Sequence, residues 1–432
     1  MSAFALGLSG IGAMFVMLFL RMPVWLALAI TGILGNVLHN NLGMAKFVAG
    51  TVFFDTASNY NLSVIPLFVL MGEVASGSRM SAELFTAART LLSGLRGGLA
   101  VASLAASGAF GAICGSSVAT AASMTRIALP EMRKAGYDDG YAAGSIAAGG
   151  SLGILIPPSI ILVIYGAIAE VSVARLFAAA LFPGLTLMLI YIAVALIVAN
   201  RRGNVPREVA ASLLERVLAL RHAWQFALLF VMTIGGIYAG VFSPNEAASV
   251  GAFGAIVLGL ARRTLSPAGL VRAVQTSVVV SCALFMIILG ATLFSQFIVQ
   301  TRLPVTLLGL AQDANLSPAM VIALIILIYV VMGCFLEGIG MVLITVPVFL
   351  PVVTGYGFDP ILFGILVAIL VELGLITPPV GMNLFIIRAQ VPDMPMAALY
   401  RGITPFLIAP LILVALILAF PPLTLWLPEV LY

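Results

Sequence analysis

The sequence predicts an all-α polytopic membrane protein built from two inverted repeats, and three observations lead to this fold class. Of the 432 residues, 62% are hydrophobic and 8% are charged, whereas about a quarter of the residues of a soluble globular protein are charged. Apolar runs long enough to cross a hydrocarbon core of about 30 Å recur along the chain. They lie at residues 4–20, 176–199, 224–241, 276–297, 320–336 and 403–427. The third observation is a constant spacing between proline motifs in the two halves.

The first apolar run is expected to remain in the protein as a membrane span. No basic residue precedes Arg21, and a cleavable signal peptide needs a positive region before its apolar segment. The formal net charge of +4 comes from arginines in loops, so it does not point to a nucleic-acid partner. Cys114, Cys282 and Cys334 are far apart in apolar sequence, which is typical of small core residues rather than of a disulfide or metal pattern.

At three separate places, a motif in the first half of the chain is followed by a matching motif in the second half after the same number of residues. Pro23 corresponds to Pro244, Leu129-Pro130 to Leu350-Pro351, and Pro157-Pro158 to Pro378-Pro379. One match would mean little in a chain with 23 prolines, but three elements that share one offset indicate an internal duplication. We therefore expect a first repeat at residues 1–200, a polar cytoplasmic linker at 201–222 and a second repeat at 223–432.

Each predicted repeat contains a helical hairpin with a polar tip. The first hairpin is expected at residues 97–132, with Gly115, Ser116 and Ser117 at its tip, and the second at 318–354, with Glu337 and Gly338 at its tip. Non-helical backbone at membrane depth is tolerated only where protein or a water-filled cavity receives it. We therefore expect both segments to be re-entrant hairpins whose tips lie near the middle of the membrane.

A broken helix follows each hairpin. Residues 138–170 contain "GILIPPS" and residues 360–390 contain "GLITPPV". Proline lacks a backbone N–H and clashes with the preceding turn, so each pair should interrupt its helix. One reading is that the prolines only kink helices for packing. The other is that the breaks hold an ion and a substrate, and the repetition of the break favours this second reading.

The distribution of basic residues predicts the orientation. If the first hairpin opens to the cytoplasm and the second to the outside, sixteen Lys and Arg residues lie inside and only Lys46, Arg175 and Arg302 lie outside. This agrees with the positive-inside rule, makes the two repeats inverted, and places both termini on the periplasmic side. Inverted repeats with paired broken helices are typical of secondary transporters whose binding site is near the membrane midplane.

The chemistry of a broken helix explains why two would be useful. One half ends in free carbonyls, which can ligate Na⁺, and the other begins with free N–H groups, which attract an anion. Ser159 and Thr377 add hydroxyls at the breaks, and Thr120 adds one near the first tip. Gly153 and Gly374 would allow either a backbone turn or a close approach of two helices.

Five ionisable residues fall at or near membrane depth. Carboxylates there are candidates for a functional role because burying their charge is costly. For Glu337 we favour a role in the site over a structural hydrogen bond. Glu372 precedes the second break by five residues, where capping or orienting the break is as consistent with the sequence as no such role. For Glu73 we favour a structural role near an interface. Arg126 and Arg388 are expected to reach the cytoplasmic surface, with contact to an anionic substrate as the alternative.

Five motifs together resemble the large membrane subunit of tripartite ATP-independent periplasmic (TRAP) transporters. They are "PLFVLMGEVASGSRM" (Pro66–Met80), "GAICGSSVATAASM" (Gly111–Met124), "GGSLGILIPPSIILVIYG" (Gly149–Gly166), "GCFLEGIGMVLITVPVFLP" (Gly333–Pro351) and "GLITPPVGMNLF" (Gly374–Phe385). The match spans almost the whole chain. The resemblance implies an elevator-type, Na⁺-coupled importer of the inner membrane, similar to the ion transporter superfamily.

The resemblance also implies partners and site residues. A periplasmic substrate-binding protein would deliver a small organic anion, and a small four-helix membrane subunit, expected here as a separate chain, would brace the scaffold. One Na⁺ site would use Gly115, Ser116, Ser117, Gly153 and Pro157, and the other Glu337, Gly338, Gly374 and Thr377. The substrate would contact Thr120, Ser159, Gly340 and Asn383. Many relatives carry Asp where this chain has Glu337, which puts direct ion contact by that carboxylate in doubt.

Three alternatives remain open on the sequence. A self-sufficient Na⁺–anion symporter would need no binding protein. An intramembrane enzyme would need a catalytic arrangement, and the spans contain no Ser-His, Cys-His, paired-Asp or zinc motif. The third alternative is a purely structural membrane subunit. The chain has no phosphate-binding loop for ATP, so we expect an ion gradient as the driving force, with Na⁺ as the coupling ion and no cofactor. The sequence does not select among C4-dicarboxylates, keto acids, sialic acid and sulfonates.

Overall fold

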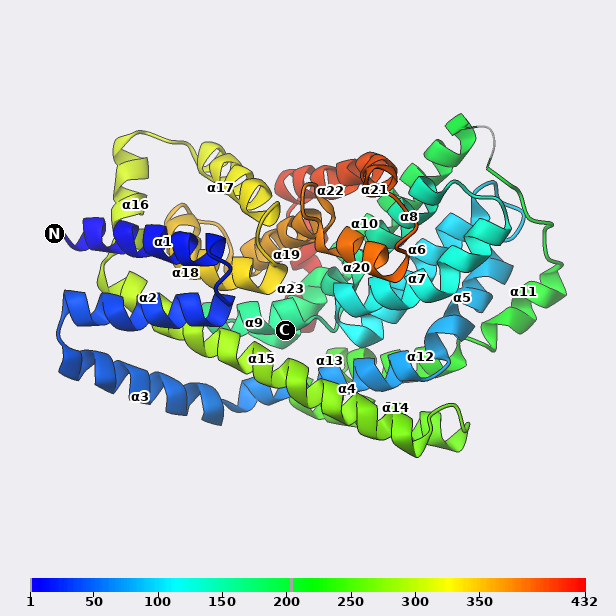
Figure 1. Ribbon diagram of the computed structural model, residues 1–432, viewed down its shortest axis with the longest axis horizontal. Coiled ribbons are helices and arrows are strands. Elements are labelled where there is room, and N and C mark those ends of the chain that lie inside the picture. The colour runs from blue at the N-terminus through cyan, green and yellow to red at the C-terminus, as the bar shows by residue number, and fades with distance from the viewer. Residues whose placement is uncertain (1, 203–204) are drawn as a thin grey trace.

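The computed structural model describes residues 2–202 and 205–432, and Figure 1 shows a molecule made of helices. The described residues form no β-strand, and one isolated backbone bridge joins Arg96 to Arg207. Residues 1, 203 and 204, which fall in the predicted first repeat and linker, lie outside the described residues. The predicted all-α class is confirmed.

The helices of the first half are α1 (Ala3–Phe19), α2 (Val24–His39), α3 (Leu42–Ser58), α4 (Val64–Gly77), α5 (Met80–Leu91), α6 (Gly98–Cys114), α7 (Ser117–Lys134), α8 (Asp139–Leu155), α9 (Ile160–Ala169) and α10 (Val173–Arg202). Those of the second half are α11 (Leu213–Leu220), α12 (Trp224–Phe230), α13 (Gly236–Tyr238), α14 (Pro244–Ala261), α15 (Pro267–Gln300), α16 (Leu303–Asp313), α17 (Pro318–Gly333), α18 (Gly338–Gly355), α19 (Pro360–Ile376), α20 (Met382–Gln390), α21 (Met396–Ile403), α22 (Ile408–Ala419) and α23 (Pro422–Leu431).

Seven helical segments in the described part of the chain are long and apolar enough to cross a membrane. They are Tyr60–Gly77, Asp139–Ala169, Val173–Arg201, Pro244–Ala261, Pro267–Gln300, Gly338–Gly355 and Met396–Ala419. The bent pair Leu213–Leu220 and Trp224–Tyr238 would make an eighth. This confirms a polytopic helical membrane protein.

The predicted apolar run at residues 403–427 overlaps a candidate span, Met396–Ala419, but the span ends earlier than the run. Helix α22 ends at Ala419 and α23 begins at Pro422, so the run is interrupted at Phe420. The physical reason is the Pro421-Pro422 pair, because neither residue has the N–H needed to continue the helical hydrogen bonds.

Two helix pairs have matching positions in the two halves. The start of α18 follows the start of α7 by the same number of residues that separates the two Pro-Pro pairs, and the ends of these two helices keep that separation. The starts and the ends of α8 and α19 keep it as well. Each of α7 and α18 follows a short turn after an apolar helix, α6 and α17 respectively. Each of α8 and α19 ends just before its Pro-Pro pair, and a shorter helix, α9 or α20, follows the pair.

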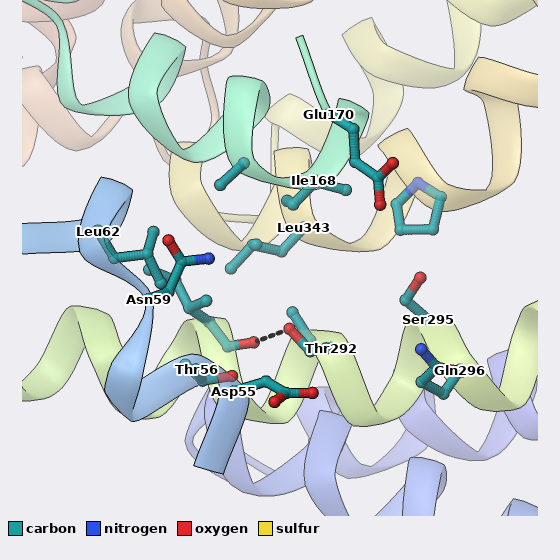
Figure 2. A pocket seen from close by; sticks show the side chains of 14 residues that line it. Asp55, Thr56, Asn59, Leu62, Ile168, Glu170, Thr292, Ser295, Gln296 and Leu343 are labelled. Carbon is teal, nitrogen blue, oxygen red and sulfur yellow. Dashed lines mark hydrogen bonds between the residues drawn. The ribbon is translucent and has the colours of Figure 1, made fainter. Parts of the chain in front are cut away.

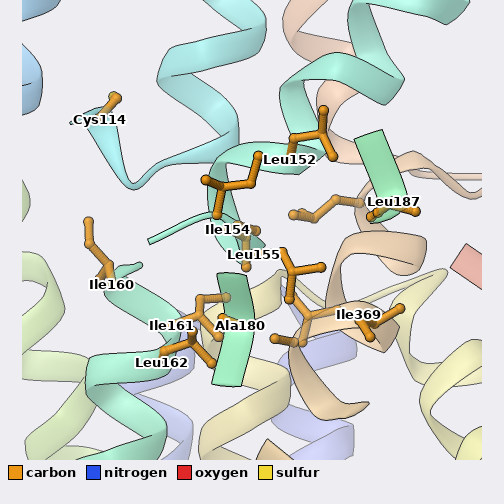
Figure 3. Packing of buried hydrophobic residues seen from close by; sticks show 14 of the residues in the cluster. Cys114, Leu152, Ile154, Leu155, Ile160, Ile161, Leu162, Ala180, Leu187 and Ile369 are labelled. Atoms are coloured by element: carbon orange, nitrogen blue, oxygen red, sulfur yellow. The ribbon is translucent and has the colours of Figure 1, made fainter. Parts of the chain in front are cut away.

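The centre of the molecule is formed by the broken helices. Residues 140–155 of α8 and 361–376 of α19 are all buried, and the two helices pack against each other. Figure 3 shows apolar side chains converging on the first break, among them Leu152 and Leu155 from α8, Ile161 from α9, Leu187 from α10 and Ile369 from α19. Pro157 and Pro158 are therefore held within the protein core, whereas Pro378 is half-buried and Pro379 is exposed.

An outer layer of long helices flanks this centre. The 34-residue helix α15 packs along α2 and α4, as Figure 1 shows. Several large apolar side chains on α15 are exposed, including Val278, Val279 and Met286. Exposed apolar surface of this kind is expected for helices that face lipid.

Ion pairs cluster where the first hairpin ends and the linker begins. Arg89 on α5 pairs with Glu131 at 2.9 Å and with Glu208 of the linker at 2.6 Å. Arg133 pairs with Asp139 at 2.8 Å, and so joins the end of α7 to the start of α8. These charged contacts gather the arginine-rich connections on one side of the apolar centre.

Candidate functional site

The first hairpin tip places backbone oxygens and a hydroxyl close together. Gly115 ends α6 in a left-handed conformation with φ +62°, and a Cβ there would lie 2.9 Å from the carbonyl oxygen of Pro158. Glycine is therefore needed for both the backbone angle and the close approach. Ser116 is the N-cap of α7, and its carbonyl accepts a hydrogen bond from Thr120 Oγ1 at 2.8 Å.

The role of Gly153 is close approach rather than a turn. It lies inside α8, and a Cβ there would be 3.0 Å from Thr120 Oγ1 and 3.1 Å from the carbonyl oxygen of Ser116. Four residues of the predicted first Na⁺ site (Gly115, Ser116, Ser117 and Gly153) thus gather at the tip, together with Thr120. Pro157 forms a cis peptide bond with Pro158, and it is the carbonyl of Pro158, which sequence reasoning did not select, that faces the tip.

The second hairpin also packs closely against its broken helix, but it does not show the same arrangement of oxygen atoms at its tip. A Cβ at Gly374 would lie 2.7 Å from the Cα of Gly333 on α17, so α17 and α19 touch backbone to backbone. Thr377 ends α19, and its hydroxyl donates to the carbonyl of Leu373 at 2.5 Å. Glu337 directly precedes α18, and a Cβ at Gly338 would lie 2.6 Å from Val371 of α19.

One cavity of about 220 Å³ joins the two tips. Gly115, Ser116 and Ser117 line it from the first hairpin, and Glu337 and Gly338 line it from the second. The remainder of its lining comes mainly from apolar residues of the broken helices, including Ile154, Ile160, Ile161, Leu375, Met382 and Ile386. The structure therefore brings five predicted ion-site residues to one place, although they come from opposite halves of the chain.

The four predicted substrate residues do not line this cavity together. Asn383 is buried, its Oδ1 accepts from Ser117 Oγ at 2.9 Å, and its amide nitrogen donates to the carbonyl of Ala147 at 3.2 Å. The hydroxyl of Ser159 accepts from the N–H of Leu162 at 3.3 Å and caps α9. These two side chains use their polar atoms inside the protein: Asn383 ties α20 to α7 and α8.

The other two predicted substrate residues are also occupied. The hydroxyl of Thr120 donates a hydrogen bond to the carbonyl of Ser116 within the tip, which places it among the residues of the predicted first Na⁺ site. A Cβ at Gly340 would lie 3.2 Å from the side chain of Val24 on α2. Gly340 therefore contacts the outer layer of helices rather than the cavity.

Glu372 is a buried carboxylate in the middle of the molecule. Its exposed fraction is 0%, and neither carboxylate oxygen has a hydrogen-bond partner among the described residues. It lies within electrostatic range of the Tyr191 hydroxyl, which is 3.2 Å from Ser151 Oγ on α8. The carboxylate therefore makes no hydrogen-bonded cap at the second break.

A second cavity, shown in Figure 2, has the opposite electrostatic character to an anion site. It measures about 320 Å³ and lies between α3, α9, α15 and α18. Asp55 and Glu170 contribute carboxylates, and Asn59, Thr292 and Gln296 contribute neutral polar groups. None of its described lining residues is basic, so this cavity repels an organic anion.

The chain matches one known protein family over almost its whole length. Residues 11–423 match the model of the family described as "Tripartite ATP-independent periplasmic transporter, DctM component". The chain belongs to this family. The match covers both hairpins, both broken helices and the outer layer, so the resemblance noted in the sequence is confirmed.

Two relatives carry names that describe large permeases of TRAP transporters. The "C4-dicarboxylate TRAP transporter large permease protein DctM" of Pseudomonas aeruginosa is 36% identical over 377 residues, which cover 87% of this chain and 88% of that protein. The "Sialic acid TRAP transporter large permease protein SiaM" of Vibrio cholerae is 32% identical over 416 residues and 96% of both chains. Both are named as transporter permeases, and the substrates in their names differ.

A solved structure supports the fold of this large permease chain. The YdaH transporter of Alcanivorax borkumensis aligns with a TM-score of 0.61 and 15% sequence identity, and the alignment covers 89% of this chain and 90% of that one. At this identity the likeness concerns the fold alone. It shows that the helical architecture is that of a membrane transporter structure.

Proposed function

We propose that this chain is the large permease of a Na⁺-coupled TRAP importer that moves a small organic anion across the bacterial inner membrane. The observation that carries the proposal is the single cavity in which both hairpin tips and both broken helices meet. Binding sites at the junction of broken helices are typical of secondary transporters. The relatives named for C4-dicarboxylates and sialic acid, both of which are carboxylates, support an anionic substrate.

The first ion site fits Na⁺ by the chemistry of its donors. The carbonyl of Ser116, the hydroxyl of Thr120 and the carbonyl of Pro158 all lie around Gly115 and Gly153. These are uncharged oxygen ligands, which suit a hard monovalent cation. We assign Thr120 to this ion site instead of to the substrate.

The second ion site would rest on Glu337 and on the end of α19. Glu337 lines the shared cavity, while Thr377 bonds within its own helix. Gly374 serves the contact with α17. This site is therefore less complete in the present conformation than the first, and Glu337 is its central residue.

The two helix pairs that recur at one constant offset support an internal duplication, and the orientation expected from the basic residues would make the two repeats inverted. In the proposed elevator mechanism, the two hairpins and the two broken helices move together against the outer layer. A periplasmic binding protein delivers the anion, and a separate small membrane subunit braces the outer layer. The matching family of tripartite transporters supports these partners over a symporter that acts alone.

The Na⁺ assignment is tested with a matched pair of variants on α7. Thr120→Val removes the hydroxyl at the tip, and Thr125→Val removes a hydroxyl that bonds to its own helix at 2.7 Å one turn further on. Loss of one ligand worth about 1.5 kcal/mol should raise the Na⁺ concentration for half-maximal uptake about tenfold in Thr120→Val. Thr125→Val should leave it unchanged.

The measurement is succinate and sialic acid uptake into proteoliposomes that contain the chain with its small subunit and binding protein. Uptake that persists when K⁺ replaces Na⁺ would refute Na⁺ coupling. Uptake by the chain alone would refute the need for partners and favour the self-sufficient symporter. Equal Na⁺ dependence in the two Thr variants would place the ion elsewhere.

The broken helices are tested by repairing one of them. Replacing Pro378 and Pro379 with alanine allows α19 to continue and draws the carbonyls at its end into helical hydrogen bonds. We expect insertion and assembly with the small subunit to persist and uptake to be lost. Full uptake with normal Na⁺ dependence would show that the prolines only kink the helix.

A further inference from the structure

A third cavity, separate from the one between the hairpin tips, is lined by three arginines. It measures about 510 Å³ and lies where α4, α5, α7 and α15 meet. Arg79, Arg126 and Arg272 contribute guanidinium groups, and Glu73 contributes one carboxylate. Four serine hydroxyls also line it: Ser76, Ser78, Ser81 and Ser123. The cavity is polar and carries a net charge of about +2 from these four ionisable groups.

The three guanidinium groups have no partner within the described part of the chain. None of them donates a hydrogen bond or forms an ion pair with another described residue. By contrast, two other arginines, Arg89 and Arg262, each pair with a carboxylate within 3 Å. Glu73 interacts with Arg126 only at longer range, without forming an ion pair.

The three arginines are exposed, so solvent screens their charges, but their guanidinium groups line one cavity, and a bound anion would relieve their mutual repulsion. Arginine presents its N–H groups as a planar fork that matches a carboxylate or a phosphate, often with two parallel hydrogen bonds. The serine hydroxyls supply further donors. The lining therefore has the chemistry of an anion site.

The cavity is placed on a path from the hairpin tip. Arg126 lies nine residues after Ser117 on α7, which corresponds to about 14 Å along the helix axis. The same helix is joined to α4 beside the cavity by the contact between Ser123 Oγ and Ser76 Oγ at 3.0 Å. Helix α7 thus runs from the shared tip cavity to the arginine cavity.

We propose that this arginine cavity binds a small carboxylate anion, as a second site that receives the transported anion after it leaves the hairpin tips. The identification of this anion with the transported substrate rests on the proposed function. On the orientation predicted from the basic residues, the site lies on the cytoplasmic side. The phosphate of an anionic lipid headgroup could make the same contacts as a carboxylate. Binding measurements in two kinds of lipid distinguish a bound carboxylate from a bound lipid headgroup.

The test measures binding of succinate, as a carboxylate probe, to the purified chain in nanodiscs of phosphatidylcholine, which carries no net charge. Arg126→Gln and Arg272→Gln should each weaken binding about tenfold or more, the loss expected for one charge-assisted contact. Glu73→Gln should strengthen binding, because it removes the one negative charge from the lining. Arg401→Gln is the control, since this exposed arginine on α21 is not part of the cavity lining.

The opposite effects of the Arg and Glu variants distinguish an anion site from damage to the fold, which would weaken binding in both. Unchanged succinate binding in Arg126→Gln and Arg272→Gln, or no succinate binding at all, would overturn the proposal. A second set of nanodiscs contains phosphatidylglycerol. Stabilisation by this lipid that depends on Arg126, without an effect of succinate, would assign the cavity to lipid headgroups and also overturn it.

Failure of this proposal is separable from failure of the proposed function. The Na⁺ dependence of uptake is tested by Thr120→Val, and Thr120 does not line the arginine cavity. Loss of succinate binding with unchanged Na⁺ dependence in Arg126→Gln is the expected combination.

Discussion

The contact between Gly333 and Gly374 predicts whether a glycine-to-alanine substitution raises or lowers the stability of the protein. Helices α17 and α19 touch there, and a Cβ at Gly333 would lie 2.7 Å from the Cα of Gly374. Gly309 on α16 provides a matched control, because no atom lies within 4 Å of the position its Cβ would take. The same substitution, glycine to alanine, therefore meets a backbone at one position and open space at the other.

The expected magnitudes follow from two opposing effects. Alanine in place of helical glycine gains about 1 kcal/mol of stability from helix propensity. At Gly333 the added methyl group meets a backbone atom that no rotamer change can move aside, so the helices must separate, at about 1–3 kcal/mol for overpacking. Gly309→Ala should therefore stabilise the protein by up to about 1 kcal/mol, whereas Gly333→Ala should be about 1–3 kcal/mol less stable than Gly309→Ala.

The assay is thermal unfolding of both variants and the wild type in the same detergent, followed by tryptophan fluorescence. Gly333→Ala should unfold at a lower temperature than Gly309→Ala, and its uptake activity should fall because the second hairpin no longer seats against α19. A Gly333→Ala protein as stable as Gly309→Ala would refute the view that glycine is present for close approach.

Three further predictions concern single side chains. Asn383→Ala should destabilise the protein by about 1–3 kcal/mol, because it leaves the buried Ser117 hydroxyl without its acceptor; an unchanged unfolding midpoint would contradict this. Glu372→Leu should not lower the unfolding midpoint, because a buried carboxylate without a partner does not stabilise the fold, yet uptake should fall; normal uptake would assign Glu372 no function. Hydrogen bonds from Lys134 and from Arg89 lower the pKa of Glu131 below its usual 4.5, so this contact stabilises above about pH 4.5 and is lost as the pH falls through the lower folded value. Arg89→Ala should therefore reduce stability at pH 7 by no more than about 1 kcal/mol and have less effect at pH 3; an equal effect at both values would contradict the pairing.

The helix boundaries around the breaks were the most predictable features, because their causes are local. A Pro-Pro pair removes two consecutive N–H donors wherever it occurs, so α8 and α19 had to end before residues 157 and 378. The same rule applied at Pro421-Pro422, where the high hydrophobicity of the surrounding run concealed it. The apolar composition there favoured one continuous helix and the proline pair favoured a break, and the proline pair was the better predictor.

Long-range contacts were less predictable, and Asn383 shows why. A polar side chain just after a break in an apolar helix is equally consistent with substrate binding and with an internal hydrogen bond. Its amide bonds to Ser117 and to the carbonyl of Ala147, residues more than 230 positions earlier in the chain. No local pattern encodes which helices α20 will pack against, so the choice between the two roles required the structure.

The arginines that line the third cavity illustrate the same limit for electrostatics. Arg126, considered alone, has a stem long enough to carry its charge to the membrane surface, and nothing nearby in the sequence demands an anion. Its role changes because α15, which comes from the second half of the chain, brings Arg272 to the same cavity as Arg79 and Arg126. Each charge raises the free energy of the others as long as the cavity lacks a counter-charge. The affinity of such a site for an anion is thus a property of the assembled helices, and it arises from three residues that each have an ordinary explanation in isolation.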